Sequence, residues 1–270
     1  MLAKTLLNKE ASAETGVKEV EITWASELGN GEMRSIMVGE QKSDKVLIAR
    51  YQGKLYSTGN FCSHFGVPLE GGMLFDDKVL CPAHAAGFSI ISGLPEQAPG
   101  LSGLPTFPVV EKDGKFFVQV PKDGLPGSVA QALAKRDPND KRHFVIIGGG
   151  AAGLNCAETL RQSGYTGQIS VISKEDVVPY DRTLITKALP VGDATKWALR
   201  PEQYLKDADI DYYLKSRAFS VNRKTQEVVL TNGDHIKYDK LCIASGSDVF
   251  KPSIAGLESK NVHYVRTDKD

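Results

Sequence analysis

The apolar positions between residues 17 and 122 fall in short runs that glycine, proline and asparagine interrupt. Residues 46–51 form one such run, and after a Gln-Gly-Lys turn the apolar pattern resumes at residues 55–57. Two further runs, at residues 109–110 and 116–120, flank an Asp-Gly pair, which is the typical sequence signal of a β-hairpin. The pattern therefore predicts a small antiparallel β domain.

The second half of the chain has a different periodicity. Residues 144–147 are a fully apolar strand, residues 151–163 read as a helix that ends before a glycine, and residues 169–172 are a second strand. A strand, a crossover helix and another strand predict a βαβ unit with a parallel sheet. Further strands are expected at residues 228–230 and 241–244.

The segment at residues 123–142 separates the two patterns. Its prolines, glycines and charged residues indicate an interdomain linker, for which we expect one helical turn. The linker divides a domain at residues 17–122 from a domain at residues 143–270, and the polar residues 1–16 are expected to be a loose leader. The expected fold class is multidomain, with an all-β domain followed by a partial α/β Rossmann-like domain.

Composition excludes several classes of protein. Lysine and arginine total 33, as do aspartate and glutamate, so the net charge is zero and nonspecific binding to nucleic acid or anionic membranes is not expected. No apolar run approaches the roughly 18 residues of a transmembrane helix, and the start of the chain lacks the apolar stretch of a secretory signal. Four cysteines do not form a disulfide framework and favour an intracellular, reducing compartment, such as the cytoplasm or the mitochondrion.

Two short motifs carry metal-ligand chemistry. Cys62 and His64 form a C-x-H motif, and after sixteen residues Cys81 and His84 form a C-x-x-H motif. Residues 17–122 therefore resemble the Rieske family, in which two cysteines hold one iron of a [2Fe–2S] cluster and two histidines hold the other. Structural zinc is the alternative, but its ligand pairs usually read C-x₂₋₄-C or H-x₃₋₅-H, which a C-x-H motif fits poorly.

The resemblance also implies the kind of iron–sulfur centre. High-potential Rieske proteins carry an extra cysteine in each loop, where this chain has Val67 and Ala83. They also carry a serine and a tyrosine that donate hydrogen bonds to sulfur, where this chain has Ala86 and Phe88, whose side chains cannot donate. Fewer donors stabilise the reduced cluster less, so we expect a potential near the ~−150 mV end of the Rieske range. The Pro-Gly pair at residues 99–100 is expected to form a third loop over the cluster.

A glycine-rich loop opens the second domain. Gly148, Gly150 and Gly153 satisfy G-x-G-x-x-G directly after an apolar strand and at the start of a helix, which is the context that dinucleotide binding requires. These glycines allow a tight turn and bring the backbone close to a pyrophosphate at the helix N-terminus. The acidic residue expected about 20 positions further on, which binds ribose, is Glu175, with Asp176 as a substitute.

Two segments favour FAD as the dinucleotide. The Pro-Tyr-Asp-Arg sequence at residues 179–182 resembles the FAD-dependent pyridine-nucleotide reductases, which implies that Arg182 contacts the cofactor phosphates. The same resemblance implies that Lys187 lies beside the isoalloxazine as the catalytic residue. For either side chain, a surface ion pair is the alternative. The segment at residues 238–247 resembles the later A-T-G motif of that family and implies that three residues pack on the FAD: Ala244, Ser245 and Gly246.

The remaining cysteines and histidines have a simpler interpretation. Cys156 and Cys242 lie 86 positions apart (242 − 156), so they do not form the close pair that disulfide reductases carry in one element. Each is expected to be a buried small hydrophobe. Three histidines are expected to be structural or exposed: His143, His235 and His263.

The order of the two domains resembles the apoptosis-inducing-factor-like proteins with an N-terminal Rieske module (the apoptosis-inducing factor 3 type) and their ferredoxin-reductase relatives. The resemblance implies an oxidoreductase that takes a hydride from NAD(P)H onto FAD and passes single electrons to the cluster and then to an unidentified acceptor protein. The alternative is a Rieske ferredoxin-type electron carrier that depends on a separate reductase. A Rieske oxygenase is disfavoured, because the remaining histidines are too scattered for its two-histidine iron site.

The family continues beyond the A-T-G motif with a second glycine fingerprint for NAD(P)H. Here 24 residues follow Gly246 (270 − 246), so the chain is expected to be a fragment or a truncated product. We therefore expect the cluster to bind, FAD to bind weakly, and this chain alone not to oxidise NADH.

Overall fold

The computed structural model describes residues 16–187 and 193–270. The chain divides into two compact units, Met1–Gln131 and Ala132–Asp270. The loose leader expected at the N-terminus lies outside the described residues, except for Gly16. Within the described ranges, no helix is both long and apolar enough to cross a membrane.

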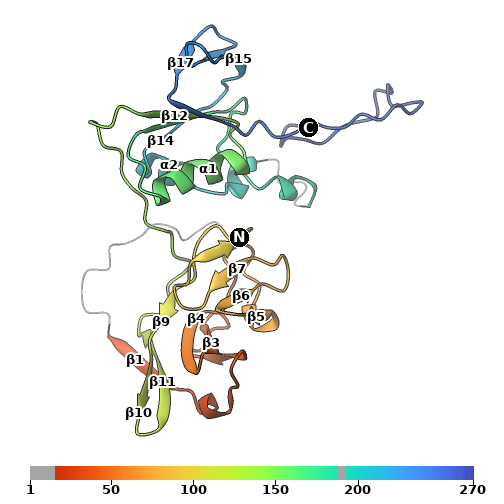
Figure 1. Ribbon diagram of the computed structural model, residues 1–270. Coiled ribbons are helices and arrows are strands. Elements are labelled where there is room, and N and C mark those ends of the chain that lie inside the picture. The colour runs from red at the N-terminus through yellow and green to blue at the C-terminus, as the bar shows by residue number, and fades with distance from the viewer. Residues whose placement is uncertain (1–15, 188–192) are drawn as a thin grey trace. The chain divides into compact units, whose positions relative to one another are not determined.

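The first unit consists of short antiparallel strands (Figure 1), as the sequence pattern predicted. They form three sheets, with strand orders β1-β11-β10, β2-β3-β4-β9 and β5-β6-β7-β8. The strands are β1 (Val17–Glu21), β2 (Met33–Met37), β3 (Lys45–Tyr51), β4 (Lys54–Gly59), β5 (Met73–Phe75), β6 (Lys78–Leu80), β7 (Gly87–Ser89), β8 (Pro95–Gln97), β9 (Thr106–Phe107), β10 (Val109–Lys112) and β11 (Lys115–Pro121), with 3₁₀ turns η1 (Ala25–Glu27) and η2 (Leu69–Gly71).

Two-residue turns join the hairpin strands of this unit. Gln52 and Gly53 have φ values of 48° and 76° between β3 and β4, and Asp113 and Gly114 have 51° and 74° between β10 and β11. Two consecutive residues with positive φ form the type I′ turn, whose twist matches that of a hairpin. The Asp-Gly signal in the sequence is thereby confirmed.

Strand β3 is buried on both faces, which explains why its run of apolar residues is continuous. Leu47 and Ala49 face a core that also contains the two predicted cysteine ligands, and Val46 and Ile48 face a second core around Val118. Alternate residues of a strand point to opposite faces, so a strand that is buried on both faces needs apolar residues throughout. The strand thus joins the core around the predicted cluster site to the rest of the unit.

The second unit contains a parallel sheet with the order β14-β13-β12-β18 and an antiparallel meander, β15-β16-β17. The expected βαβ unit is confirmed, and the strands expected at residues 228–230 and 241–244 are present, the first in the meander and the second in the parallel sheet. The elements are β12 (His143–Ile147), α1 (Ala151–Gln162), β13 (Gln168–Ile172), η3 (Arg182–Thr186), η4 (Ala194–Trp197), α2 (Glu202–Asp207), β14 (Ile210–Tyr213), β15 (Ala218–Asn222), β16 (Glu227–Leu230), β17 (His235–Lys237) and β18 (Lys240–Ile243).

The parallel sheet is covered on both faces (Figure 1). Ile146 of β12 packs against Ala157 of α1 on one face, and the neighbouring Val145 packs against Val228 and Leu230 of the meander on the other. Because β12 is buried on both sides, it carries the fully apolar sequence that indicated a parallel strand. Because the strands are parallel, their carboxyl ends meet at one edge of the sheet. The glycine loop, which follows β12, lies at this edge.

The prediction of a helical turn between the domains was wrong, because residues 123–142 contain turns and an isolated bridge but no helix. Leu125 packs against the first unit, and Val129 exchanges both backbone hydrogen bonds with Gly103 (2.7 and 2.8 Å). Further along, the Ala134 amide donates to the Arg161 carbonyl (3.0 Å) of the second unit. The backbone bonds that a helix would satisfy internally are made to other segments instead.

Candidate functional site

The predicted cluster ligands lie on two loops that share one backbone arrangement. Between β4 and β5, the Cys62 amide donates to the Val67 carbonyl (2.9 Å) and the Gly66 amide donates to the Cys62 carbonyl (2.8 Å). Between β6 and β7, the Cys81 amide likewise donates to the carbonyl five residues later (2.9 Å), and its carbonyl accepts from Ala85 (3.0 Å). The fourth residue after each cysteine has a positive φ, 68° at Gly66 and 58° at Ala85. The two loops therefore close in the same way, although their histidines are spaced differently.

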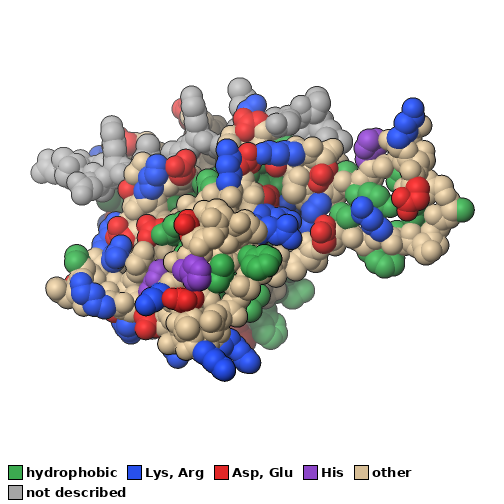
Figure 2. Space-filling view, turned by 90° about the horizontal axis from the view of Figure 1, so that it is seen from above, with side chains coloured by type: hydrophobic (Ala, Val, Ile, Leu, Met, Phe, Trp, Pro, Cys, Tyr) green, Lys and Arg blue, Asp and Glu red, His purple; other side chains and the backbone are tan. Residues whose placement is uncertain are grey.

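The four predicted ligands form two pairs of different exposure. Cys62 and Cys81 are 3% and 4% exposed and pack in one buried core. The His64 and His84 ring centroids are 5.0 Å apart with their planes at 78°, and His84 is exposed whereas His64 is half-buried. Figure 2 shows basic and acidic side chains interspersed over the face in view. The sulfur pair thus lies inside the unit and the imidazole pair lies toward solvent.

Two opposing effects act on the inner sulfurs. Burial raises the pKa of the Cys62 thiol, and the contact with Cys81 raises it further. Hydrogen bonds from the backbone amides of His64 and Phe65 lower the same pKa, because they stabilise the thiolate. A bound iron would act in the same direction as these amides, since a coordinating thiol is deprotonated.

This donor set fits a two-iron cluster. A structural zinc ion takes four ligands that converge on one point, whereas each iron of a Rieske centre takes two protein ligands. Here one thiol pair and one imidazole pair are present, and each loop gives one member to each pair. Cys62, His64, Cys81 and His84 therefore stay the predicted ligands of a [2Fe–2S] cluster.

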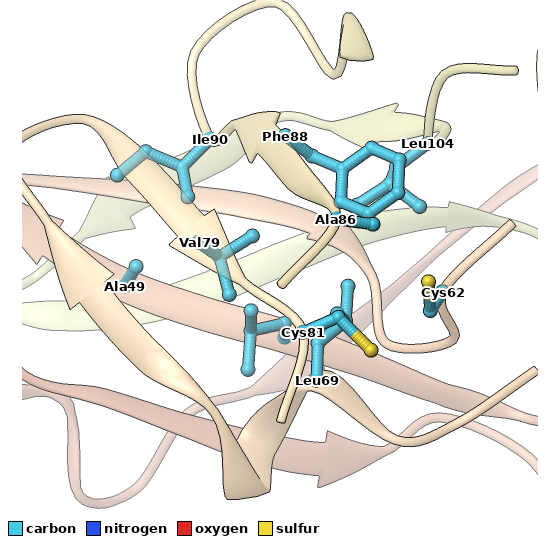
Figure 3. Close-up of a cluster of buried hydrophobic side chains, with 10 residues drawn as sticks. Ala49, Cys62, Leu69, Val79, Cys81, Ala86, Phe88, Ile90 and Leu104 are labelled. Atoms are coloured by element: carbon cyan, nitrogen blue, oxygen red, sulfur yellow. The ribbon is translucent and has the colours of Figure 1, made fainter. Parts of the chain in front are cut away.

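Apolar side chains surround the two sulfurs (Figure 3). Ala86 and Phe88, which replace the hydroxyl donors of high-potential Rieske proteins, are fully buried in the same core as Cys62 and Cys81. Neither side chain can donate a hydrogen bond. The surroundings of the sulfurs are thus those expected for a low-potential centre.

The third loop packs against the first cluster loop. A Cβ on Gly100 would lie 2.7 Å from the Phe88 ring and 3.5 Å from the Ser63 hydroxyl, so only glycine allows this approach. The Ser63 hydroxyl, between two predicted ligands, donates to the Ser102 carbonyl (2.7 Å). The sequence indicated the Pro-Gly loop, but no local pattern indicated the role of Ser63.

The glycine loop of the second unit lies at the carboxyl edge of the parallel sheet. Gly148 has a φ of 122°, and a Cβ there would collide with the carbonyl oxygen of Ala244, which follows β18. A Cβ on Gly153 would in turn collide with the Gly148 carbonyl. The Ala244 amide donates to the Ile147 carbonyl (2.8 Å). The structure thus brings together the start of the fingerprint and the A-S-G segment, which are far apart in sequence.

The N-terminus of α1 offers room for an anion. Gly150 precedes the helix, and the space where its Cβ would stand is open to at least 4 Å. Ser245 and Gly246, which follow Ala244, are exposed, and the Arg266 guanidinium lies 3.4 Å from the Cβ position of Gly246. Free backbone amides and an arginine are groups that bind phosphate. Arg266 is a site candidate that the sequence analysis missed, although it occurs in the Val-Arg-Thr segment near the end of the chain.

Glu175 and Arg182, predicted to bind ribose and phosphate, are bonded to each other. The Arg182 guanidinium forms an ion pair with the Glu175 carboxylate and also donates to the Tyr180 hydroxyl (2.9 Å) and the Arg266 carbonyl (2.9 Å). The Tyr180 hydroxyl donates to the other Glu175 oxygen (3.0 Å). Burial and the Glu175 charge raise the pKa of Tyr180 to about 12, so it remains a neutral donor.

A carboxylate has about four acceptor positions, so Glu175 can still accept from ribose hydroxyls. The contacts among Glu175, Tyr180 and Arg182 are therefore compatible with a bound dinucleotide. A cavity of about 400 Å³ adjoins it, lined by Lys174, Glu175, Asp176, Lys215 and residues 267–269.

Lys187 and the two remaining cysteines lie apart from these contacts. Lys187 follows η3, is exposed, and donates to the Thr183 carbonyl (3.2 Å), so its role beside a flavin stays a prediction.

Cys156 and Cys242 are half-buried, less than the sequence analysis expected, and pack in one core. Burial and the contact with Cys242 raise the pKa of Cys156 to about 11. A thiol with this pKa is almost entirely protonated at neutral pH and is unreactive.

Two family descriptions match the chain, one on each unit. Residues 18–108 match the Rieske [2Fe-2S] domain, and residues 142–270 match the pyridine nucleotide-disulphide oxidoreductase domain. The chain joins a Rieske domain to a pyridine nucleotide-disulphide oxidoreductase domain. The first of these contains both predicted ligand loops, and the second begins with the strand before the glycine fingerprint.

Related proteins have the same combination or its second half. Human apoptosis-inducing factor 3 is 33% identical over 258 residues, covering 93% of this chain and 42% of that protein. Rubredoxin-NAD(+) reductase of Pseudomonas putida is 34% identical over 129 residues, covering 47% of this chain and 34% of its own length. A ferredoxin reductase structure from Rhodopseudomonas palustris is 30% identical, with a TM-score of 0.45, over 48% of this chain and 32% of that one. The Rieske–oxidoreductase chain thus spans well under half the length of these curated relatives.

Proposed function

We propose that this oxidoreductase passes electrons from NAD(P)H through FAD to a Rieske [2Fe–2S] cluster and then to an acceptor protein. The observation that carries the proposal is the pair of matched loops, which place one thiol and one imidazole each around a common site. The same chain holds a fingerprint loop whose glycines allow close contact with the A-S-G segment. One chain therefore provides a site for an electron-storing cluster and a site for a hydride-accepting dinucleotide.

The residues of the first unit have separate roles in this proposal. Cys62 and Cys81 would hold one iron of the cluster from within an apolar core. His64 and His84 would hold the other iron, and the exposed His84 ring is the side from which an acceptor protein can approach. The cluster would supply one-electron transfer, with its cysteine ligands shielded from solvent and its exposed histidine ligand facing it.

In the second unit, the residues bind and orient the dinucleotide. Amides at the start of α1 bind the pyrophosphate, and Glu175 accepts from ribose hydroxyls while Tyr180 and Arg182 hold its carboxylate. Lys187 is the residue proposed to lie beside the flavin ring. Bound FAD accepts a hydride and returns electrons singly.

Free thiols in the described residues agree with a reducing compartment, and we place the protein in the cytoplasm or the mitochondrion.

An anaerobic reduction experiment tests the proposal. The protein is reconstituted with iron, sulfide and FAD, NADH is added, and flavin absorbance and the electron paramagnetic resonance of the cluster are recorded together. We expect H84C to change the cluster spectrum and G150W to remove bound FAD while leaving the cluster intact. A colourless protein with one zinc per chain would contradict the cluster assignment.

A second candidate is a Rieske ferredoxin-type carrier that receives electrons from a separate reductase. The observation that favours it is that both ligand loops and the core beneath them lie within the first compact unit, which contains none of the predicted dinucleotide contacts. The same reconstituted protein separates the two functions. Because this chain alone is not expected to oxidise NADH, the deciding measurement is photoreduction of the bound FAD. Electron transfer from reduced FAD to the cluster supports the proposed function, and reduction of the cluster only by dithionite or by an added reductase supports the carrier.

A further inference from the structure

The segment that follows β11 is attached to the first unit at two points. Leu125 packs against the core around Val118. Val129 forms an isolated antiparallel bridge with Gly103, in which the Gly103 amide donates to the Val129 carbonyl (2.7 Å) and the Val129 amide donates to the Gly103 carbonyl (2.8 Å). We call residues 125–129 the strap.

The bridge is one residue away from a contact with the cluster ligands. Ser102 precedes Gly103, and its carbonyl accepts the hydroxyl of Ser63 (2.7 Å). Ser63 lies between Cys62 and His64 in the sequence. The strap, the third loop and the first cluster loop are therefore joined by consecutive hydrogen bonds.

We propose that Val129 is a positioning residue, and that the strap holds the third loop closed over the cluster site. The closed loop keeps Ser63 in place and limits the access of water to the cluster. This inference rests on the cluster of the proposed function, but not on FAD or NAD(P)H. Water access stabilises the more negative, reduced cluster, so opening the loop raises the potential.

The test compares V129P with V129A in the full chain. Proline removes the amide that donates to Gly103, whereas alanine keeps both backbone bonds. For V129P we expect at least tenfold faster hydrogen exchange of the Gly103 amide, several-fold faster iron release to a chelator and a higher midpoint potential. V129A is expected to match the wild type in all three measurements.

A second variant distinguishes opening of the loop from a general loss of folding in V129P. S63A removes the other bond of the series without a proline, and we expect the same directions of change. The double variant V129A/S63A is expected to equal S63A, and V129P/S63A is expected not to exceed the larger single effect. Additive effects of V129P and S63A would show that they do not act through one loop, and would overturn the proposal.

The outcomes also separate this inference from the proposed function. If the wild type binds no cluster, the proposed function fails, and the exchange of the Gly103 amide still reports whether the strap holds the loop. If the cluster binds and V129P accelerates exchange without changing iron release or potential, the positioning role of Val129 is wrong.

Discussion

Replacing Ala86 by serine tests directly why this Rieske centre is expected to have a low potential. Ala86 is fully buried in the core that holds Cys62 and Cys81, so water cannot satisfy a new hydroxyl there. A buried hydroxyl without a partner costs about 1–3 kcal/mol, which favours the rotamer that donates to the cluster sulfurs. The added donor therefore acts on the cluster.

The size of the effect follows from the charge of the cluster. A hydrogen bond to a charged acceptor contributes about 1.5 kcal/mol, and the reduced cluster carries one more negative charge than the oxidised cluster. For a one-electron couple, a tenfold change in the equilibrium, about 1.4 kcal/mol, corresponds to about 59 mV. We expect A86S to raise the midpoint potential by about 60 mV, measured by a redox titration followed by electron paramagnetic resonance.

Ala49 provides the matched control for this measurement. It lies in the same core, 1% exposed, and Figure 3 shows it on the opposite side of the core from Cys62. A49S introduces the same buried hydroxyl away from the sulfurs, so it should lower stability and leave the potential unchanged. An unchanged or lowered potential in A86S, with the cluster retained, would refute the argument that missing donors make the centre low-potential.

Three further predictions concern stability. Ala85 has a φ of 58°, a conformation that costs an L-residue roughly 1–2 kcal/mol, whereas glycine costs about 0.5–1 kcal/mol in entropy. A85G should therefore raise the free energy of unfolding in urea by about 0.5–1 kcal/mol, and G66A should lower it. A change of the same sign in both variants would contradict this. Arg161 is fully buried and donates to four backbone carbonyls, so R161M should destabilise the second unit by about 3–5 kcal/mol, and a loss below about 1 kcal/mol in thermal unfolding would argue against it. Burial lowers the pKa of His143, so the unfolded chain binds a proton at higher pH than the folded chain. Stability should be greatest above pH ~6.5 and fall as the pH decreases below it. H143Q should flatten this slope in unfolding curves measured at several pH values, and an unchanged slope would contradict the reasoning.

The sequence predicted those features that depend on neighbouring residues. The hairpin at β10 and β11 follows from its Asp-Gly turn, and the βαβ unit follows from two apolar strands and a helix of the right length. The ligand motifs were also visible, because each lies within one loop.

Features that depend on distant residues were not predictable in this way. The bridge between Gly103 and Val129 turns an apolar stretch into an extended strap, and the helical turn expected there was wrong. Cys156 and Cys242, separated by 86 positions, share one core because β12 and β18 are neighbours in the sheet. The ion pair of Glu175 with Arg182 likewise depends on how the loop after β13 folds back. Local periodicity carries no information on such contacts.

The matched backbone arrangement of the two ligand loops bears on how the cluster is acquired. Both loops close through their own amide–carbonyl bonds, and apolar side chains already fill the core beneath the cysteines. Zinc fingers, in contrast, fold only when their metal binds. In this unit the bonds that close the ligand loops are made by the polypeptide backbone itself. The exposed His84 ring is the part of the ligand set that solvent reaches, so a cluster would enter from that side.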